Sequence, residues 1–326
     1  MGSMRAAFVG GCPRSGTTLL GALLGSHTDC LCVPESHFKI DALRAGDIDL
    51  ERVTPSRAIE RMKQDRDFLG WEGSPALPEP ADAPVVSYAE LIEWLVRRYG
   101  AQVGKPAPKL WVDHTPDNAR YASTLFSMFP DAKMIHIVRD GRAVAASVMP
   151  LHWGPNRIDQ AARYWLFQVG QGLAAEACWG PERVARIRYE DLVVEPEAVL
   201  QRLCAFLEID YQPGMLRADG FTVPAHMRTP FPLIGKPPDP RRIDAWRTAL
   251  TAREIELFED RVDDFLQYFG YPSLYGLRAR PLSRREQVES ALDGIRRHAR
   301  RWVLYSWRRL AGRAPANRWR RRPASW

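Results

Sequence analysis

Short apolar runs alternate with longer stretches of helical pattern along most of the chain. The apolar runs are four to six residues long and predict buried strands at 6–10, 30–33, 109–112, 133–138 and 184–189. The stretches with helical pattern lie between them, at 17–26, 88–99, 118–129, 142–148 and 159–178. Alternation of this kind is typical of a parallel sheet covered by helices on both faces. We therefore expect an α/β fold built on a parallel sheet.

Residues 41–108 separate the second expected strand from the third and predict a helical insertion. Within them, the segment 70–84 is rich in Pro, Gly and Ala and indicates an exposed loop. Insertions in such folds often carry lids and substrate contacts. We expect 41–108 to be a lid or substrate-binding insertion.

The net charge of +7 is unevenly distributed. Residues 278–326 hold 15 arginines, no lysine and three acids, a net charge of +12, which leaves −5 for residues 1–277. We therefore divide the chain into a main domain at 4–277 and a basic tail at 278–326. Whole-chain charge would suggest nucleic-acid binding, but the main domain is acidic, so we do not expect nucleic acid as a partner.

The tail predicts an amphipathic helix over 284–311. One stripe of it, apolar except for a single serine, is spaced by threes and fours: Val288, Leu292, Ile295, Ala299, Trp302, Ser306 and Leu310. Arginines occupy the other face, and Trp302 and Trp307 lie at the boundary. This composition suits a helix on an anionic membrane surface. The alternative is a helix packed on the acidic main domain or on a second copy of the chain, as in a homodimer.

The segment VGGCPRSGTT (9–18) has the glycine spacing of a phosphate-binding loop, with Gly11 and Gly16 between an expected strand and an expected helix. The nucleotide triphosphatase version continues with Lys and then Ser or Thr, but here Thr17 and Thr18 follow, and Arg14 lies inside the loop. The alternative is an ordinary glycine-rich turn. The missing lysine and the missing magnesium carboxylate argue against a small-molecule kinase.

The five cysteines have an odd count and fit no zinc spacing, so we expect no metal and a reducing, cytoplasmic location. Cys30 and Cys32 fall on alternate positions of an expected strand and are interpreted as buried side chains. The chain has no run of 18 uncharged apolar residues, so we expect no membrane span. A tail on a lipid surface would make the protein peripheral at the membrane.

Two motifs together, VGGCPRSGTTLL and IVRDGRAVAASV, resemble the sulfotransferase family that uses 3′-phosphoadenosine 5′-phosphosulfate (PAPS). Within the family, the chain is most similar to tyrosylprotein sulfotransferases and their bacterial relatives. The resemblance covers about 6–272. It implies an enzyme that moves a sulfuryl group from PAPS, without a metal, to a hydroxylated acceptor: a small molecule, a sugar, a lipid or a peptide side chain.

The resemblance also assigns the donor site. It places the 5′-phosphosulfate on Arg14, Ser15, Gly16, Thr17 and Thr18. It places the 3′-phosphate on Arg139 and Ser147, with Tyr189 near the 3′ side of the adenosine and Lys236 as a late cation over the 3′-phosphate. The spacing of eight has a physical reading, because Arg139 would close a strand and Ser147 would lie about two turns along the next helix. The alternative is that Arg139 forms a local ion pair with Asp140.

Glu35, in VPESHFKI after the second expected strand, matches the glutamate that is the general base in the tyrosylprotein relatives. His37, two residues on, is an alternative base or a substrate contact. The other possibility is that Glu35 caps a helix and His37 is a surface residue. Relatives commonly carry lysine where this chain has His114; a protonated His114 would share with Arg14 the charge on the bridging oxygen, or His114 only packs or caps.

A second interpretation belongs to another class. The chain would then be an inactive phosphate-loop module that binds a nucleotide and uses its basic tail on a membrane or a partner. Glu35 favours the enzyme, because a binding module needs no carboxylate at that position.

Overall fold

The computed structural model describes residues 4–45, 48–65, 68, 71, 85–151, 153–221 and 239–296. The chain forms two compact units: Met1–Ile137 with Gln171–Pro238, and Val138–Gly170 with Asp239–Trp326. The described part of the tail belongs to the second unit, and the division of the chain at 277 stays a prediction. None of the described helices is long and apolar enough to cross a bilayer.

A five-stranded sheet forms the centre of the first unit. Its order is β2 (Cys30–Val33), β3 (Leu110–Asp113), β1 (Arg5–Gly11), β4 (Lys133–Val138) and β5 (Val184–Arg188). β1 pairs in parallel with β3 and β4, and β2 pairs in parallel with β3. The predicted α/β fold with a parallel sheet is confirmed. The strand order reverses at β1, because β2 and β3 lie on one side of it and β4 and β5 on the other. Ligands of open α/β folds bind beyond the carboxyl ends of the strands at such a point.

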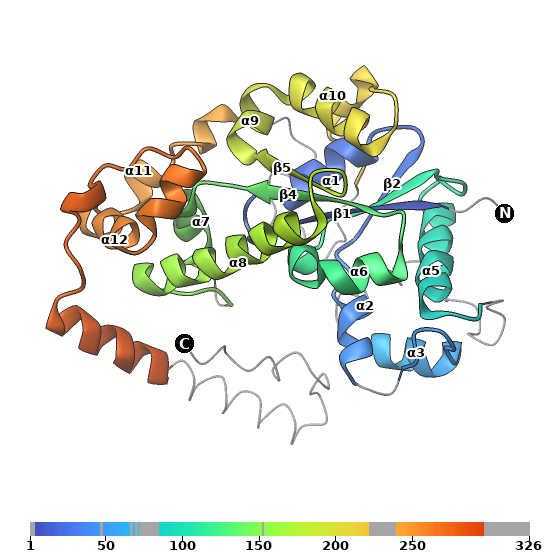
Figure 1. The fold of residues 1–326 in the computed structure, drawn as a ribbon, viewed down its shortest axis with the longest axis horizontal. Coiled ribbons are helices and arrows are strands. Elements are labelled where there is room, and N and C mark those ends of the chain that lie inside the picture. Colours follow the sequence, from blue (N-terminus) through green and yellow to red (C-terminus); the bar gives the residue numbers. More distant parts are fainter. Residues whose placement is uncertain are drawn as a thin grey trace. The chain divides into compact units, whose positions relative to one another are not determined.

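Helices cover both faces of this sheet because side chains of each strand alternate in direction. On β2, Cys32 lies against α1 (Thr17–Gly25), whereas Leu31 lies against α5 (Tyr88–Gln102). Figure 1 shows α1 and α10 (Pro196–Leu207) on one face, with α5 and α6 (Ala122–Met128) on the other. The prediction that Cys30 and Cys32 are buried is confirmed, and burial raises the pKa of Cys30 to about 12.

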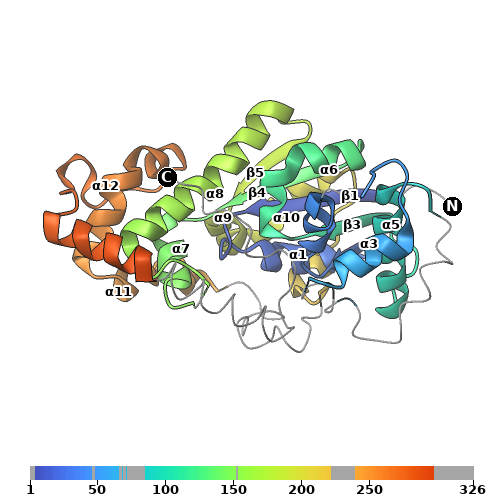
Figure 2. The ribbon, with the colours of Figure 1, turned by 90° about the horizontal axis from the view of Figure 1, so that it is seen from below.

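The insertion is helical, as predicted, but much of it is a structural layer. α5 starts with a capping box, Ser87 and Glu90, and buries Leu91, Ile92, Leu95 and Val96 in the core. α3 (Pro55–Met62) buries Ala58, Ile59 and Met62 in the same core. Figure 2 shows α3 and α5 in front of the sheet. Most of the loop expected at 70–84 lies outside the described residues, and the lid role of 41–108 stays a prediction.

The second unit is built from helices, with an aromatic core. Trp165 of α8 (Ile158–Trp179) packs near Phe258 of α12 (Ala252–Tyr268) and near Phe269. Gly141 begins α7 (Gly141–Val148), and a Cβ there would lie 2.5 Å from Phe258 Cζ. Only glycine allows this approach.

The described residues also form shorter elements in both units. Those of the first unit are α2 (Phe38–Asp41), α9 (Tyr189–Val194), η1 (Leu43–Ala45), η3 (Pro116–Tyr121) and η4 (Pro213–Arg217). Those of the second unit are α11 (Trp246–Ala249), η6 (Pro240–Arg242) and η7 (Gly276–Arg278).

Candidate active site

The phosphate loop has the predicted strand–loop–helix form, from the end of β1 at Gly11 to the start of α1 at Thr17. Gly16 has φ of +96°, and a Cβ there would lie 2.5 Å from Cδ2 of Tyr189. A Cβ at Gly11 would lie 2.3 Å from the carbonyl oxygen of Ile137. Arg14 also adopts positive φ, +75°. Both glycines are therefore required by close approaches of neighbouring chain.

The interior of the loop suits an anion. Ser15 is fully buried, and its Oγ has no hydrogen-bond partner among the described residues. A buried hydroxyl left without a partner costs about 1–3 kcal/mol. No side chain caps the start of α1 at Thr17. Helix starts of this kind commonly bind anions through their first backbone amides. An oxygen of a phosphate or sulfate group would satisfy both features.

Glu35, His37 and Asp117 lie together beyond the ends of β2 and β3. Nε2 of His37 is 3.5 Å from Oε2 of Glu35, and Nδ1 of His37 is 3.7 Å from Oδ2 of Asp117. The side chains of Glu35 and His37 are 19% and 15% exposed. α2 starts after His37 without a side-chain cap, so Glu35 does not cap it. The imidazole therefore lies between two carboxylates, and the part played by Asp117 was not expected from the sequence.

The charge state of Glu35 suits a base. Burial alone would raise the pKa of Glu35, but the hydrogen bond and positive charge of His37, with a smaller contribution from His114, more than offset this effect. The pKa of Glu35 therefore lies below its ordinary value. At neutral pH the carboxylate is ionised, which is the form that can accept a proton.

A buried network holds the chain between Glu35 and His37. Nζ of Lys39 lies 2.7 Å from Oδ2 of Asp113, and the hydroxyl of Ser36, which lies between Glu35 and His37, donates to the same oxygen. The amide of Ser36 donates to Oγ1 of Thr115 at 2.8 Å, and Lys39 donates to Oδ1 of Asn118 at 2.8 Å. The segment that carries the candidate base is thus tied to the end of β3.

Burial would raise the pKa of Asp113, but Lys39 and the hydroxyls of Ser36 and Thr115 lower it well below its ordinary value. This pair was not expected from the sequence. A signal was present, because Lys39 interrupts the apolar pair Phe38 and Ile40.

His114 is buried beside the sheet. Its Nδ1 lies 3.5 Å from Sγ of Cys32, its ring lies edge-on to Phe221, and Gly21 of α1 makes room for it. Burial lowers the pKa of His114, although Glu35 and Asp113 partly oppose the shift. The neutral form of His114 is therefore favoured. This argues against the charged role and in favour of the packing role.

Tyr189, the first residue of α9, is buried against Gly16 of the phosphate loop. The structure therefore brings Tyr189 to the loop that the resemblance assigns to the 5′-phosphosulfate. Lys236 lies outside the described residues, and its assigned role stays a prediction.

The second motif has the local structure expected for it. Arg139 directly follows β4, and Ser147 lies near the end of α7, about two turns on. Both side chains are partly buried, and Nη2 of Arg139 donates to the carbonyl oxygen of Arg242 at 3.3 Å.

The next two charged residues of this motif are structural. The side chain of Asp140 accepts from the amide of Arg142 at the start of α7 and pairs with its guanidinium at 2.7 Å. Arg142 also pairs at 2.7 Å with Glu259 of α12, and all three side chains are buried. The motif therefore combines an assigned ligand residue with a buried ion-pair cluster.

The expected residues fall in both units. The first unit brings together the segments after β1, β2 and β3. Burial raises the pKa of Cys12 in the phosphate loop, and the charge of Asp117, which follows β3, raises it further. Arg139 and Ser147 belong to the second unit. In the part of the chain that the structure describes, no group of three or more His, Cys, Asp or Glu side chains could hold a metal ion.

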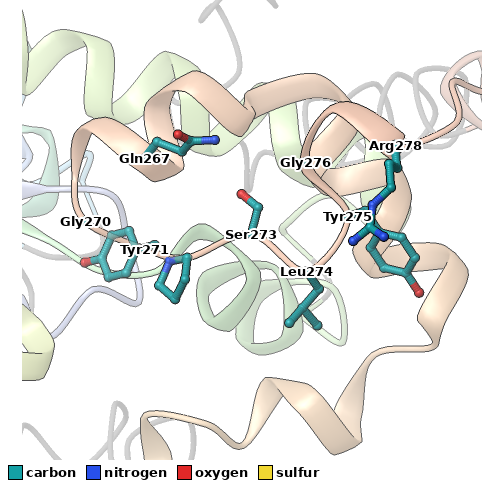
Figure 3. Close-up of a pocket in the computed structure, with 9 residues that line it drawn as sticks. Gln267, Gly270, Tyr271, Ser273, Leu274, Tyr275, Gly276 and Arg278 are labelled. Carbon is teal, nitrogen blue, oxygen red and sulfur yellow. The ribbon is translucent and has the colours of Figure 1, made fainter.

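A surface pocket of about 500 Å³ lies in the second unit along 267–278, at a distance in sequence from every expected site residue (Figure 3). Gln267 and Ser273 line it, and both donate to the carboxylate of Asp263. Because these polar groups already have a partner within the unit, the pocket offers no argument for a ligand site.

Comparison with known sequences agrees with these features. A profile described as "Sulfotransferase family" matches residues 6–213. The protein-tyrosine sulfotransferase of Drosophila melanogaster is 27% identical over 222 residues, which cover 66% of this chain and 40% of that protein. Nodulation protein NoeE of Sinorhizobium fredii is 28% identical over 291 residues, which cover 81% of this chain and 65% of that protein. The chain spans less than half the length of the fly relative.

Comparison with solved structures concerns the fold alone. The sulfotransferase domain from the curacin biosynthetic pathway superposes with a TM-score of 0.57 at 24% identity, covering 84% of this chain and all of that domain. The sulfotransferase domain from the Synechococcus PCC 7002 olefin synthase has the same TM-score and covers 82% of this chain. Both support the architecture described above.

Proposed function

Since this chain belongs to the sulfotransferase family, we propose that it transfers a sulfuryl group from PAPS to a hydroxyl of an acceptor. The observation that carries the proposal is the phosphate loop, where the buried hydroxyl of Ser15 has no partner among the described residues and lies beside a helix start without a side-chain cap. Such a loop binds an anion, and without the lysine of the triphosphatases it is not built for a β/γ-phosphate pair.

The proposed donor site follows the motifs. Arg14, Ser15, Gly16, Thr17 and Thr18 hold the 5′-phosphosulfate, while Arg139 and Ser147 hold the 3′-phosphate, with Tyr189 and Lys236 beside the nucleotide. A guanidinium offers two parallel donors to a phosphate monoester, which suits Arg139 to its role. PAPS itself supplies an activated sulfuryl group on a phosphate leaving group.

The proposed transfer is a single in-line displacement. The acceptor oxygen forms a bond to sulfur while the bond from sulfur to the bridging phosphate oxygen breaks, and that oxygen keeps the electron pair. The acceptor proton passes to the carboxylate of Glu35. Arg14 stabilises the charge that develops on the departing phosphate. The products are a sulfate ester, adenosine 3′,5′-bisphosphate and a proton, and no metal takes part.

His37 and Asp117 are positioned to support this base. His37 keeps Glu35 ionised through its hydrogen bond and charge, and Asp117 lies on the other side of the ring. Asp117 would therefore orient the imidazole rather than contact the acceptor.

The acceptor remains a class rather than a compound. Relatives of the chain are named protein-tyrosine sulfotransferases and a nodulation protein, so a tyrosine-containing peptide is the first acceptor to test, followed by other phenols, sugars and hydroxylated lipids. We propose a cytoplasmic location, because the odd number of cysteines and their spacing suggest neither a disulfide framework nor a zinc site.

Calorimetry tests the donor, and a transfer assay tests the chemistry. We expect the chain to bind adenosine 3′,5′-bisphosphate, and to bind adenosine 5′-phosphate and ATP weakly. Labelled sulfuryl donor should then label an acceptor in the presence of excess chelator. Equal affinity for the two adenosine phosphates would remove the 3′-phosphate assignment. Donor binding without transfer to any acceptor class would favour the inactive module, and a strict magnesium requirement would contradict the metal-free mechanism.

A further inference from the structure

The last described helix, residues 284–296, is attached to the second unit through its polar side (Figure 1, orange-red). Glu286 pairs with Arg253 of α12 at 2.9 Å, and Ser290 donates to Asp159 of α8 at 2.5 Å. One turn further on, Asp293 accepts from Asn156 at 3.2 Å. Positions 286, 290 and 293 are spaced by four and three, so they form one face of the helix.

This attachment is specific and charged. The hydrogen bonds from Arg253 and Ser283 lower the pKa of Glu286 to about 2, so the ion pair persists at neutral pH. Ser283 and Glu286 also exchange hydrogen bonds at the start of the helix, which fixes where it begins. Polar contacts therefore set the orientation of this helix on the unit.

The apolar side of the same helix faces away from these contacts. Val288, Leu292 and Ile295 repeat the spacing of four and three, and they are 59%, 47% and 65% exposed. An amphipathic helix of a globular protein ordinarily buries its apolar stripe and exposes its polar face. Here the arrangement is inverted: the polar face is packed and the apolar stripe is exposed. Exposed apolar surfaces of this kind mark sites that bind another protein or a membrane.

The sequence around this stripe indicates which kind of surface it binds. Residues 278–326 carry a net charge of +12, all of it from arginine, and include Trp302, Trp307, Trp319 and Trp326. The apolar periodicity of 288–295 also continues in sequence to Leu310. Arginine attracts anionic headgroups, and tryptophan favours the boundary between headgroup and acyl chain. We propose that the stripe Val288, Leu292 and Ile295 docks on an anionic lipid surface.

This inference stands independently of the proposed function, because none of its residues belongs to the candidate active site. It also reconciles the two alternatives raised by the tail sequence. The polar face of 284–296 packs on the protein's own second unit, and the apolar face is left for the membrane. The contacts with the second unit then fix the direction in which the helix presents its apolar face.

Co-sedimentation of the full chain with lipid vesicles tests the proposal. We expect binding to phosphatidylcholine vesicles that contain phosphatidylglycerol, weaker binding to phosphatidylcholine alone, and a decrease with added salt. Val288→Glu should reduce binding to the anionic vesicles by on the order of tenfold. The glutamate places a polar group in the apolar stripe, and it has the same negative charge as the lipid headgroups. Val194→Glu is the matched control, because Val194 in α9 is also 59% exposed and lies outside the stripe.

Three results would overturn the proposal: no binding to anionic vesicles, equal loss in Val288→Glu and Val194→Glu, or equal binding to both vesicle types. A fall in the solution mass of the Val288→Glu variant, measured by analytical ultracentrifugation, would instead show that the stripe joins two copies. Circular dichroism of each variant confirms that it is folded. Donor binding in all variants should equal that of the parent chain, whatever the outcome with vesicles.

Discussion

Lys39 and Asp113 form an ion pair in the interior of the first unit, with 2.7 Å between Nζ and Oδ2 and both side chains almost completely buried. The pair lies directly behind the segment that carries Glu35 and His37, since the hydroxyl of Ser36 donates to Asp113. The stability of the fold and the placement of the candidate base therefore depend on the same contact.

Lys39→Met should lower the free energy of unfolding by about 3–5 kcal/mol, because it leaves the Asp113 carboxylate buried without its cation. Urea denaturation at pH 7 measures the loss. Adding Asp113→Asn to Lys39→Met should recover part of it. Lys109→Met is the control: Lys109 also forms a 2.8 Å ion pair, with Asp29, but it is exposed, so its loss should change stability little. Equal losses at the two lysines would contradict the argument.

The same pair predicts a dependence of stability on pH. The pKa of Asp113 is lower in the folded chain than its ordinary value near 3.9. The unfolded state therefore binds the proton more readily, so this stabilisation is fully present above about pH 4 and is lost as the pH falls below it. Denaturation between pH 3 and pH 7 should show a steeper acid decline in the parent chain than in the Lys39→Met/Asp113→Asn variant.

Glu35→Gln should lower turnover by roughly 10²–10⁴ while donor binding stays unchanged, as for the loss of a general base. Turnover is measured with labelled PAPS, and binding is measured by calorimetry with adenosine 3′,5′-bisphosphate. If Glu35→Gln keeps near-parent turnover while His37→Ala abolishes it, the base is His37.

His37→Ala offers a second test of the same site through its pH profile. Glu35 accepts a proton only when ionised, so activity should fall on the acid side as the pH approaches the pKa of Glu35. His37 lowers that pKa. Removing His37 should therefore move the acid limb of the rate profile to higher pH, toward or above the ordinary glutamate value near 4.3. An unchanged acid limb would mean that Glu35 is not the group that titrates.

Ser15→Ala should separate ligand binding from stability. The hydroxyl of Ser15 is buried and has no partner among the described residues, so its removal should leave the thermal midpoint equal or slightly higher. Adenosine 3′,5′-bisphosphate should bind roughly tenfold to a hundredfold more weakly, as for a lost hydrogen bond to a charged group. Ser36→Ala is the comparison: its hydroxyl already bonds to Asp113, so that variant should lose thermal stability. A fall in stability for Ser15→Ala without a loss of affinity would contradict the assignment.

The two arginines of the second motif should behave in opposite ways. Arg139→Ala should weaken binding of the 3′,5′-bisphosphate by tens-fold or more, with little loss of stability. Arg142→Ala leaves Asp140 and Glu259 buried without their cation, so it should cost about 3–5 kcal/mol of unfolding free energy. Calorimetry and urea denaturation of both variants test the division. Loss of stability in both would mean that Arg139 is structural as well.

The sheet and the phosphate loop could be predicted because their signals are local. Each strand is a short apolar run, and Gly11, Gly16 and Thr17 lie within seven residues of one another. Glu35 was found because it follows a strand end. Its role as base rests on the resemblance, however, and stays a prediction.

Long-range pairings could not be read from the sequence. Lys39 and Asp113 are 74 positions apart, and nothing in either segment specifies the other. Asp117 was assigned no role because it stands in a short polar run after Pro116, where its distance from His37 depends on how β2 and β3 pair. α5 was included in the insertion because its apolar positions reveal a buried face but not which surface covers it.

The space around His114 constrains which neighbouring sequences this chain could reach by single changes. A Cβ on Gly21 would lie 3.0 Å from the Cβ of His114 and 3.0 Å from Sγ of Cys32, and Phe221 covers the ring. A lysine at 114 would need a different course or a larger cavity between Gly21, Cys32 and Phe221. The side chain at position 114 is therefore tied to its neighbours, so a longer residue there would require compensating changes in α1 or β2.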